Sequence, residues 1–123
     1  MVSAGGRVFY VVDEGQTSLT DPPLPERWTL TARDAFNGVL LWKRPLQPGF
    51  MIHRNTMIAT PEFLYLADDE SCKRIDAATG AVLKQHAATA GTMEFVHDRG
   101  VLFVVTGSPE AEQAAVDPQW KSL

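Results

Sequence analysis

Two stretches of this sequence repeat each other: Arg33-Asp34-Ala35-Phe36-Asn37-Gly38-Val39-Leu40-Leu41-Trp42 and Ile75-Asp76-Ala77-Ala78-Thr79-Gly80-Ala81-Val82-Leu83-Lys84. They align without a gap. Asp34 lies 42 residues before Asp76, and Gly38 lies the same distance before Gly80. A period of about 40 to 45 residues is typical of repeats that each form one four-stranded sheet. The spacing therefore predicts a fold made of repeated sheets.

Each copy has the chemistry of a β-hairpin turn. The carboxylates of Asp34 and Asp76 are suited to accept backbone N–H groups across the turn. The glycines adopt positive φ at low cost, and Asn37-Gly38 is a favoured dipeptide in tight hairpins. Alanine after each aspartate leaves room for a neighbouring strand. We interpret the repeated residues as structural: Asp34, Ala35, Gly38, Trp42, Asp76, Ala77 and Gly80.

Apolar segments of strand length precede the hairpins at residues 7–12 and 63–67, and a third begins at residue 100. We expect them to be strands with both faces covered. The first repeat should occupy residues 7–46, the second 50–88, and a third should start at 92–108. The proline-rich residues 16–27 are interpreted as an inserted loop, and 109–123 as a short helix or tail. The predicted fold is all-β: a partial β-propeller of about two to three four-stranded antiparallel blades in residues 1–108.

Composition excludes several classes of protein. The chain has 123 residues, of which 45% are hydrophobic and 21% charged, which suits one globular domain. Its formal net charge of -4 makes nucleic acid an improbable partner. No apolar stretch approaches the roughly 18 residues that span a membrane, and the N-terminus carries no export signal of its own. A lone cysteine forms no intrachain disulfide, so it does not reveal the redox compartment.

The repeat resembles those of pyrrolo-quinoline-quinone (PQQ)-like β-propellers, in which an apolar strand precedes Asp-Ala-x-Thr/Asn-Gly and the next strand ends in tryptophan. The resemblance covers roughly residues 7 to 108, and residues 28–46 are similar to propeller domains of large exported bacterial proteins. It implies that Trp42 packs between adjacent blades. The second copy has Lys84 at that position. Complete members are usually exported, which implies a periplasmic or extracellular location.

The family includes quinone-dependent dehydrogenases and non-catalytic scaffolds such as the outer-membrane barrel assembly lipoprotein. Fold alone does not choose between them. The dehydrogenases bind PQQ and calcium, often over a disulfide of adjacent cysteines and beside a catalytic aspartate. That set has no counterpart here, because Cys72 has no cysteine neighbour. We expect no catalytic, cofactor-binding or metal-binding residue in this chain.

Other candidate sites in the sequence have simpler interpretations. The acidic clusters at residues 13–14 and 68–70 lack the spacing of a calcium loop. His53, His86 and His97 are not spaced as metal-ligand pairs. The glycines at residues 5–6 lack the lysine of a phosphate-binding loop, and Ser108 lacks the glycines of a nucleophile elbow.

The function predicted from the sequence is a non-catalytic binding or scaffold module, a fragment of a longer propeller. One alternative is a fragment of a PQQ-dependent oxidoreductase whose active-site residues lie outside this chain. Another is a spacer propeller within a larger enzyme. The expected partner is the remainder of the propeller, or a second copy through exposed blade edges.

Overall fold

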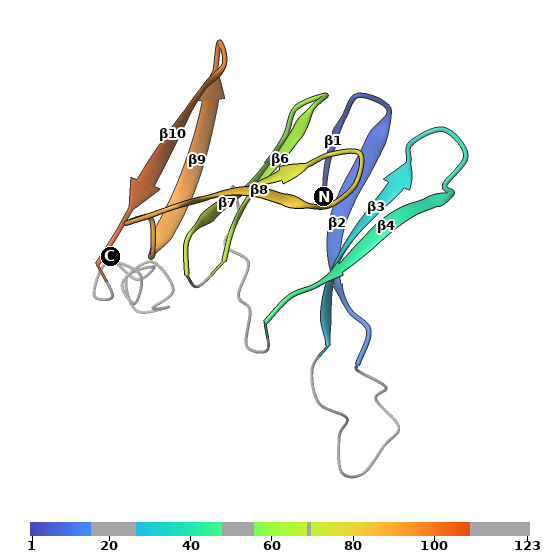
Figure 1. Ribbon diagram of the computed structural model, residues 1–123, viewed down its shortest axis with the longest axis horizontal. Helices are drawn as coiled ribbons and strands as arrows, with labels where there is room; N and C mark the ends of the chain where they lie inside the picture. The colour runs from blue at the N-terminus through green and yellow to red at the C-terminus, as the bar shows by residue number, and fades with distance from the viewer. Residues whose placement is uncertain (16–26, 48–55, 69, 109–123) are drawn as a thin grey trace, which may run out of the picture.

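The computed structural model describes residues 1–15, 27–47, 56–68 and 70–108, which form ten strands and no helix (Figure 1). The first sheet contains β1 (Val2–Ala4), β2 (Arg7–Asp13), β3 (Trp28–Asp34) and β4 (Leu40–Pro45). The second contains β5 (Met57–Ala59), β6 (Phe63–Ala67), β7 (Cys72–Asp76) and β8 (Val82–His86). A two-stranded hairpin follows, made of β9 (Thr92–Asp98) and β10 (Val101–Thr106). All strand pairs are antiparallel, so the all-β prediction is confirmed.

The three units share one register. Their first two strands pair Val2 with Phe9, Ile58 with Tyr65, and Val96 with Phe103. In both four-stranded sheets the register between the third and fourth strands then shifts, between Ala32 and Arg33 and again between Arg74 and Ile75. These irregularities are 42 residues apart, which is the period of the sequence repeat.

The first sheet begins earlier in the chain than the expected first repeat. The first sheet begins at Val2 and not at residue 7. The sequence did not predict β1, because a strand of three residues is too short to show an alternating pattern. Gly5 and Gly6, with φ of 55° and 75°, form its turn to β2. The first described strand of the second sheet begins at Met57, and the expected start of this repeat at residue 50 lies outside the described residues. The expected inserted loop, apart from Arg27, and the expected helix or tail at 109–123 lie outside the described residues.

Two apolar layers join the three units. The larger lies between the two four-stranded sheets, where Phe9, Leu30 and Ala32 meet Leu64, Leu66 and Ile75. The smaller lies between the second sheet and the hairpin, around Phe95 and Cys72. Full burial of a large apolar side chain contributes about 1.5–3 kcal/mol. Burial between sheets therefore holds the units together.

The first strands of the three units are neighbours. β1 contacts β5, and β5 contacts β9. Figure 1 shows the hairpin, the second sheet and the first sheet following one another across the long axis of the view. The chain thus stacks successive sheets face to face, with their first strands adjacent.

The hairpin differs from the expectation that its apolar strand is covered on both faces. Leu102 and Val104 pack toward the second sheet. The opposite side of the hairpin is exposed, and we call it the open face: Val96, Val101, Phe103 and Val105. Phe103 is 55% exposed, whereas Phe9 at the same place in the first sheet is fully buried. The difference arises because no described residue covers this side of the hairpin.

Candidate functional site

The two repeated turns have the same internal hydrogen bonds. Asp34 Oδ1 accepts the backbone N–H groups of Phe36 and Asn37. Asp76 Oδ1 accepts those of Ala78 and Thr79, and also the Thr79 hydroxyl. In both turns the glycine N–H donates to the carbonyl of the aspartate. This is the turn arrangement that the sequence motif predicts.

These bonds stabilise the charged carboxylates. The Asn37 and Phe36 amides lower the pKa of Asp34. The Thr79 amide and hydroxyl, followed by the Ala78 amide, lower the pKa of Asp76. Hydrogen bonds donated to a carboxylate favour its ionised form. Both aspartates are therefore turn acceptors, and neither has the raised pKa of a general acid.

Trp42 and Arg44 on β4 connect the first sheet to the turn of the second. Trp42 Nε1 donates to the carbonyl of Ala77 at 3.0 Å. Arg44 Nη1 donates to the carbonyl of Gly80 at 2.9 Å. The indole lies against Gly80, and its centroid is 5.9 Å from that of Phe9. Trp42 thus packs between two successive sheets.

The two turns differ in their surroundings. Ala77 and Gly80 are buried beneath Trp42, whereas Ala35 and Gly38 are exposed. The local motif is the same, and the difference comes from the neighbouring sheet. Sequence reasoning missed Arg44 as a contact residue. The position of Arg44 could have indicated this contact, because a residue two places after Trp42 lies on the same face of a strand.

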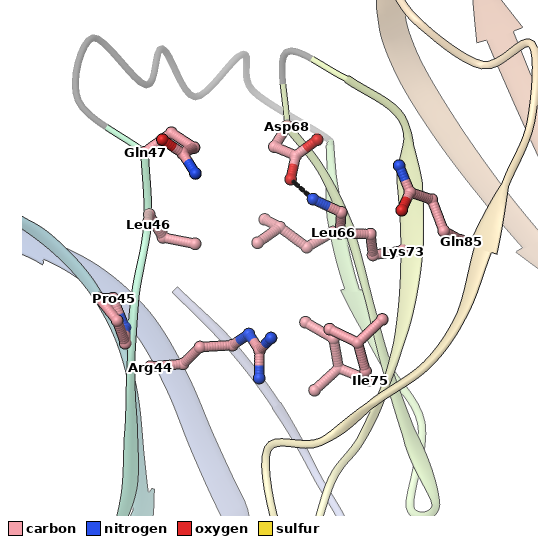
Figure 2. A pocket seen from close by; sticks show the side chains of 10 residues that line it. Arg44, Pro45, Leu46, Gln47, Leu66, Asp68, Lys73, Ile75 and Gln85 are labelled. Atoms are coloured by element: carbon pink, nitrogen blue, oxygen red, sulfur yellow. Dashed lines mark hydrogen bonds and ion pairs between the residues drawn. The ribbon is translucent and has the colours of Figure 1, made fainter.

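A groove of about 320 Å³ opens beside this contact, between β4 and the second sheet (Figure 2). Leu66, Ile75 and Val82 supply apolar lining. Polar groups come from Arg44 and Gln47 on one side and from Lys73 and Gln85 on the other. In Figure 2 the Arg44 side chain extends from β4 toward Ile75. The groove is one candidate binding site among the described residues.

An ion pair fixes one end of the groove. Lys73 Nζ donates to Asp68 Oδ2, and Glu70 lies 3.5 Å from the same ammonium. Partial burial acts to lower the pKa of Lys73, but the hydrogen bond to Asp68 and the charges of Asp68 and Glu70 outweigh it, so the pKa is raised. Lys73 is therefore a fixed cation, not a base.

The remaining reactive side chains form no catalytic arrangement in the part of the chain that the structure describes. Cys72 is fully buried in the smaller apolar layer, and burial, followed by the charge of Asp68, raises its pKa to about 11. His97 lies with its ring centroid 6.1 Å from that of Tyr65. His53 lies outside the described residues. Among the described residues, neither Cys72 nor His97 lies in a pair of a nucleophile with a base.

The described residues do not fit the PQQ and calcium set that the resemblance implies. Calcium takes six to eight oxygen ligands. The groove offers one carboxylate, Asp68, which is already bonded to Lys73. Cys72 faces Ala67 and Phe95 in the core and lines no part of this groove. Residues 1–15, 27–47, 56–68 and 70–108 contain no cluster of three metal-ligating side chains.

Comparison with known proteins finds no family model that matches the chain and no curated protein similar to it. Among the described residues, no helix has the length and apolar character that a membrane crossing requires.

Proposed function

We propose that this chain is part of a β-propeller of the PQQ-like type and acts as a non-catalytic binding or scaffold module. The observation that carries the proposal is the contact of Trp42 and Arg44 with the turn of the next sheet. Through this contact, side chains of the last strand of one repeat bind the turn of the following repeat. The 42-residue period, the shared register and the adjacent first strands agree with blades arranged around an axis.

The open face of the hairpin is the proposed binding surface. Val96 and Phe103 occupy the register positions of Val2 and Phe9, which pack on the second sheet. Apolar side chains that a repeat buries elsewhere are here exposed, and exposed apolar patches mark interaction sites. The partner is the remainder of the propeller, or another copy of the chain.

The outer side of the first sheet, at the opposite end of the stack, carries polar side chains beside the exposed Val12. On the outer side of the first sheet, Arg33 Nε donates to the Tyr10 hydroxyl at 2.9 Å, and Lys43 is paired with Glu14. Arg33 stands at the repeat position of buried Ile75. We expect association driven by apolar burial to use the hairpin end, because the four large apolar side chains of the open face are exposed together there.

Sedimentation velocity of the full chain tests the proposal. We expect concentration-dependent association, which Phe103→Asp weakens about tenfold or more, since burial of one phenylalanine contributes about 1.5–3 kcal/mol. Phe36→Asp is the matched control, because Phe36 is 90% exposed on a turn and lies outside the open face. A sharply monodisperse monomer at every concentration contradicts association between copies of the chain. Equal effects of the two substitutions contradict the use of the open face.

A cofactor titration separates the scaffold from the oxidoreductase alternative. The full chain is mixed with PQQ and calcium, and bound quinone is measured by absorption after gel filtration. The scaffold proposal expects no quinone to elute with the protein. Stoichiometric bound quinone supports the oxidoreductase alternative instead.

A further inference from the structure

The groove between β4 and the second sheet contains polar residues that the repeat does not require. Lys73 stands 42 residues after Thr31, and Gln85 stands 42 residues after Lys43. Thr31 is fully buried, so a strand at this place in the repeat needs no ammonium group. The Lys73 side chain is only 19% exposed, and partial burial of a cation costs free energy. The basic character of the groove is therefore specific to this pair of sheets.

The lining of the groove has an excess of positive charge. It contains two cations, Arg44 and Lys73, and one carboxylate, Asp68, so its formal charge is +1. The whole chain, in contrast, has a net charge of -4. Glu70 lies 3.5 Å from the Lys73 ammonium, but its side chain is 63% exposed and does not line the groove. An anion therefore complements the lining.

Asp68 is already engaged by its own neighbours. Its Oδ1 accepts the backbone N–H groups of Glu70 and Ser71, and its Oδ2 accepts a hydrogen bond from Lys73. This carboxylate thus balances Lys73 and not Arg44. In the part of the chain that the structure describes, Arg44 forms no ion pair. The charge of Arg44 is the one that an anionic ligand would balance.

The guanidinium of Arg44 is held in position by the protein itself. Its Nη1 donates to the carbonyl of Gly80 at 2.9 Å, which uses one of its five N–H groups. Figure 2 shows the side chain extending from β4 toward Ile75. A guanidinium fixed in this way loses little conformational entropy on binding, and its planar fork matches a carboxylate. Gln47 and Gln85 add amide donors from the two sides of the groove.

The rest of the lining is largely apolar. Leu66 and Ile75 are each 1% exposed, and Leu46 and Val82 are partly buried beside them. The volume of about 320 Å³ lies at the lower end of the range for small-molecule sites. A bare inorganic anion would fill little of this volume and would leave the apolar wall in contact with water. The lining therefore fits a small organic anion.

We propose that the groove binds a small organic monocarboxylate with an apolar body. The carboxylate accepts hydrogen bonds from the Arg44 guanidinium and a glutamine amide, and the apolar body covers Leu66 and Val82. One negative charge matches the formal charge of +1, whereas a dianion such as a phosphate monoester exceeds it. This ligand site goes beyond the scaffold role, and it needs only the two sheets that pack together in the described residues.

Titration of the isotopically labelled full chain tests this site. The probe is phenylacetate, and its matched control is phenylacetamide, which has the same apolar body without the charge. We expect saturable NMR shifts of the Leu46 and Val82 methyl groups, with a dissociation constant of about 1 mM or tighter. The amide should bind about tenfold more weakly, because it lacks the charge-assisted hydrogen bonds. Acetate should also bind more weakly, because it has no body to cover the apolar wall.

Two substitutions change the charge of the groove independently. Arg44→Gln should weaken phenylacetate binding about tenfold, because the new side chain keeps an amide donor for the Gly80 carbonyl but loses the charge. Gln85→Glu should also weaken it, since it adds a second carboxylate to the lining. Gln85→Glu does not alter the hydrogen bond between Arg44 and Gly80, so it still tests the site if Arg44→Gln fails to fold.

Lys43→Gln is the matched control for Arg44→Gln. It removes the same charge from the adjacent residue, but Lys43 lies on the other face of β4, where it pairs with Glu14. It should change the affinity for phenylacetate by less than about twofold. The NMR signal of the Trp42 indole N–H, which donates to Ala77, reports whether the contact between the sheets is intact in each variant.

Several results would overturn the proposed ligand site. Equal affinity for phenylacetate and its amide would show an uncharged cleft, and equal affinity for acetate would show attraction to surface charge alone. Equal weakening by Lys43→Gln and Arg44→Gln, or no saturable shift at about ten times the expected dissociation constant, would also contradict it. Phe103→Asp should leave phenylacetate binding unchanged, so failure of this site is distinguishable from failure of association through the open face.

Discussion

The indole of Trp42 lies so close to Gly80 that a β-carbon on residue 80 would stand 2.7 Å from two atoms of the ring. Gly80 has φ of 77°, and its repeat partner Gly38 has φ of 73°. Nothing lies within 4 Å of the corresponding β-carbon at Gly38. Both turns therefore require glycine for its positive φ. Only the second turn also requires glycine because a side chain would collide with Trp42.

This contrast predicts unequal effects of alanine at the two glycines. Gly38→Ala should lower the free energy of unfolding by about 1–2 kcal/mol, which is the cost of a left-handed conformation for an L-residue. Gly80→Ala should cost at least about 1 kcal/mol more, because Trp42 must move. Urea denaturation followed by circular dichroism measures both values. Equal destabilisation by the two variants would show that the Trp42 contact adds nothing.

Substitutions of Trp42 should separate its packing from its hydrogen bond. Trp42→Phe keeps an aromatic ring but removes the donor to the Ala77 carbonyl, and should cost about 1 kcal/mol. Trp42→Ala should cost up to about 3 kcal/mol, because the larger apolar layer also loses a partly buried ring. Both are read from the denaturation midpoint. If the phenylalanine variant is as unstable as the alanine variant, the hydrogen bond and not the packing dominates.

The turn aspartates should make stability depend on pH. Their pKa values in the folded state lie below the ordinary value of 3.8. A lowered carboxyl pKa contributes stability that is present above that ordinary value and is lost as the pH falls through the folded value. Asp34→Asn combined with Asp76→Asn should therefore flatten the decline of stability below about pH 4. An unchanged acid profile, measured by thermal unfolding, would contradict this role.

Cys72 should be unreactive in the folded chain. Its thiol is fully buried and its pKa is raised to about 11, so the thiolate is scarce at neutral pH. We expect a thiol reagent at pH 7 to label it slowly, and labelling to accelerate in denaturant with the loss of structure. The control is the unfolded chain under the same conditions. Rapid stoichiometric labelling of the folded chain would show that the smaller apolar layer does not protect Cys72.

Much of the fold could be predicted from the sequence, because each repeated turn is stabilised by interactions among its own residues. Asp34 and Gly38 act within their own turn, so their residue types alone indicate a hairpin. The short strand β1 was missed because three residues show no periodicity. The groove was also missed, since Arg44 and Lys73 are separated in sequence and share a cavity only after two sheets pack together.

The sequence by itself determined the all-β class, the 42-residue period and the structure of both turns. The period is visible in the sequence itself. The strands and turns depend on interactions between residues a few positions apart, which the local sequence encodes. Only the tertiary structure decided that Trp42 and Arg44 bind the second turn and that the first turn stays exposed. It also decided which face of the hairpin the other described residues leave exposed. Identical motifs acquire different roles because burial depends on which sheet lies opposite, and the local sequence does not contain that information.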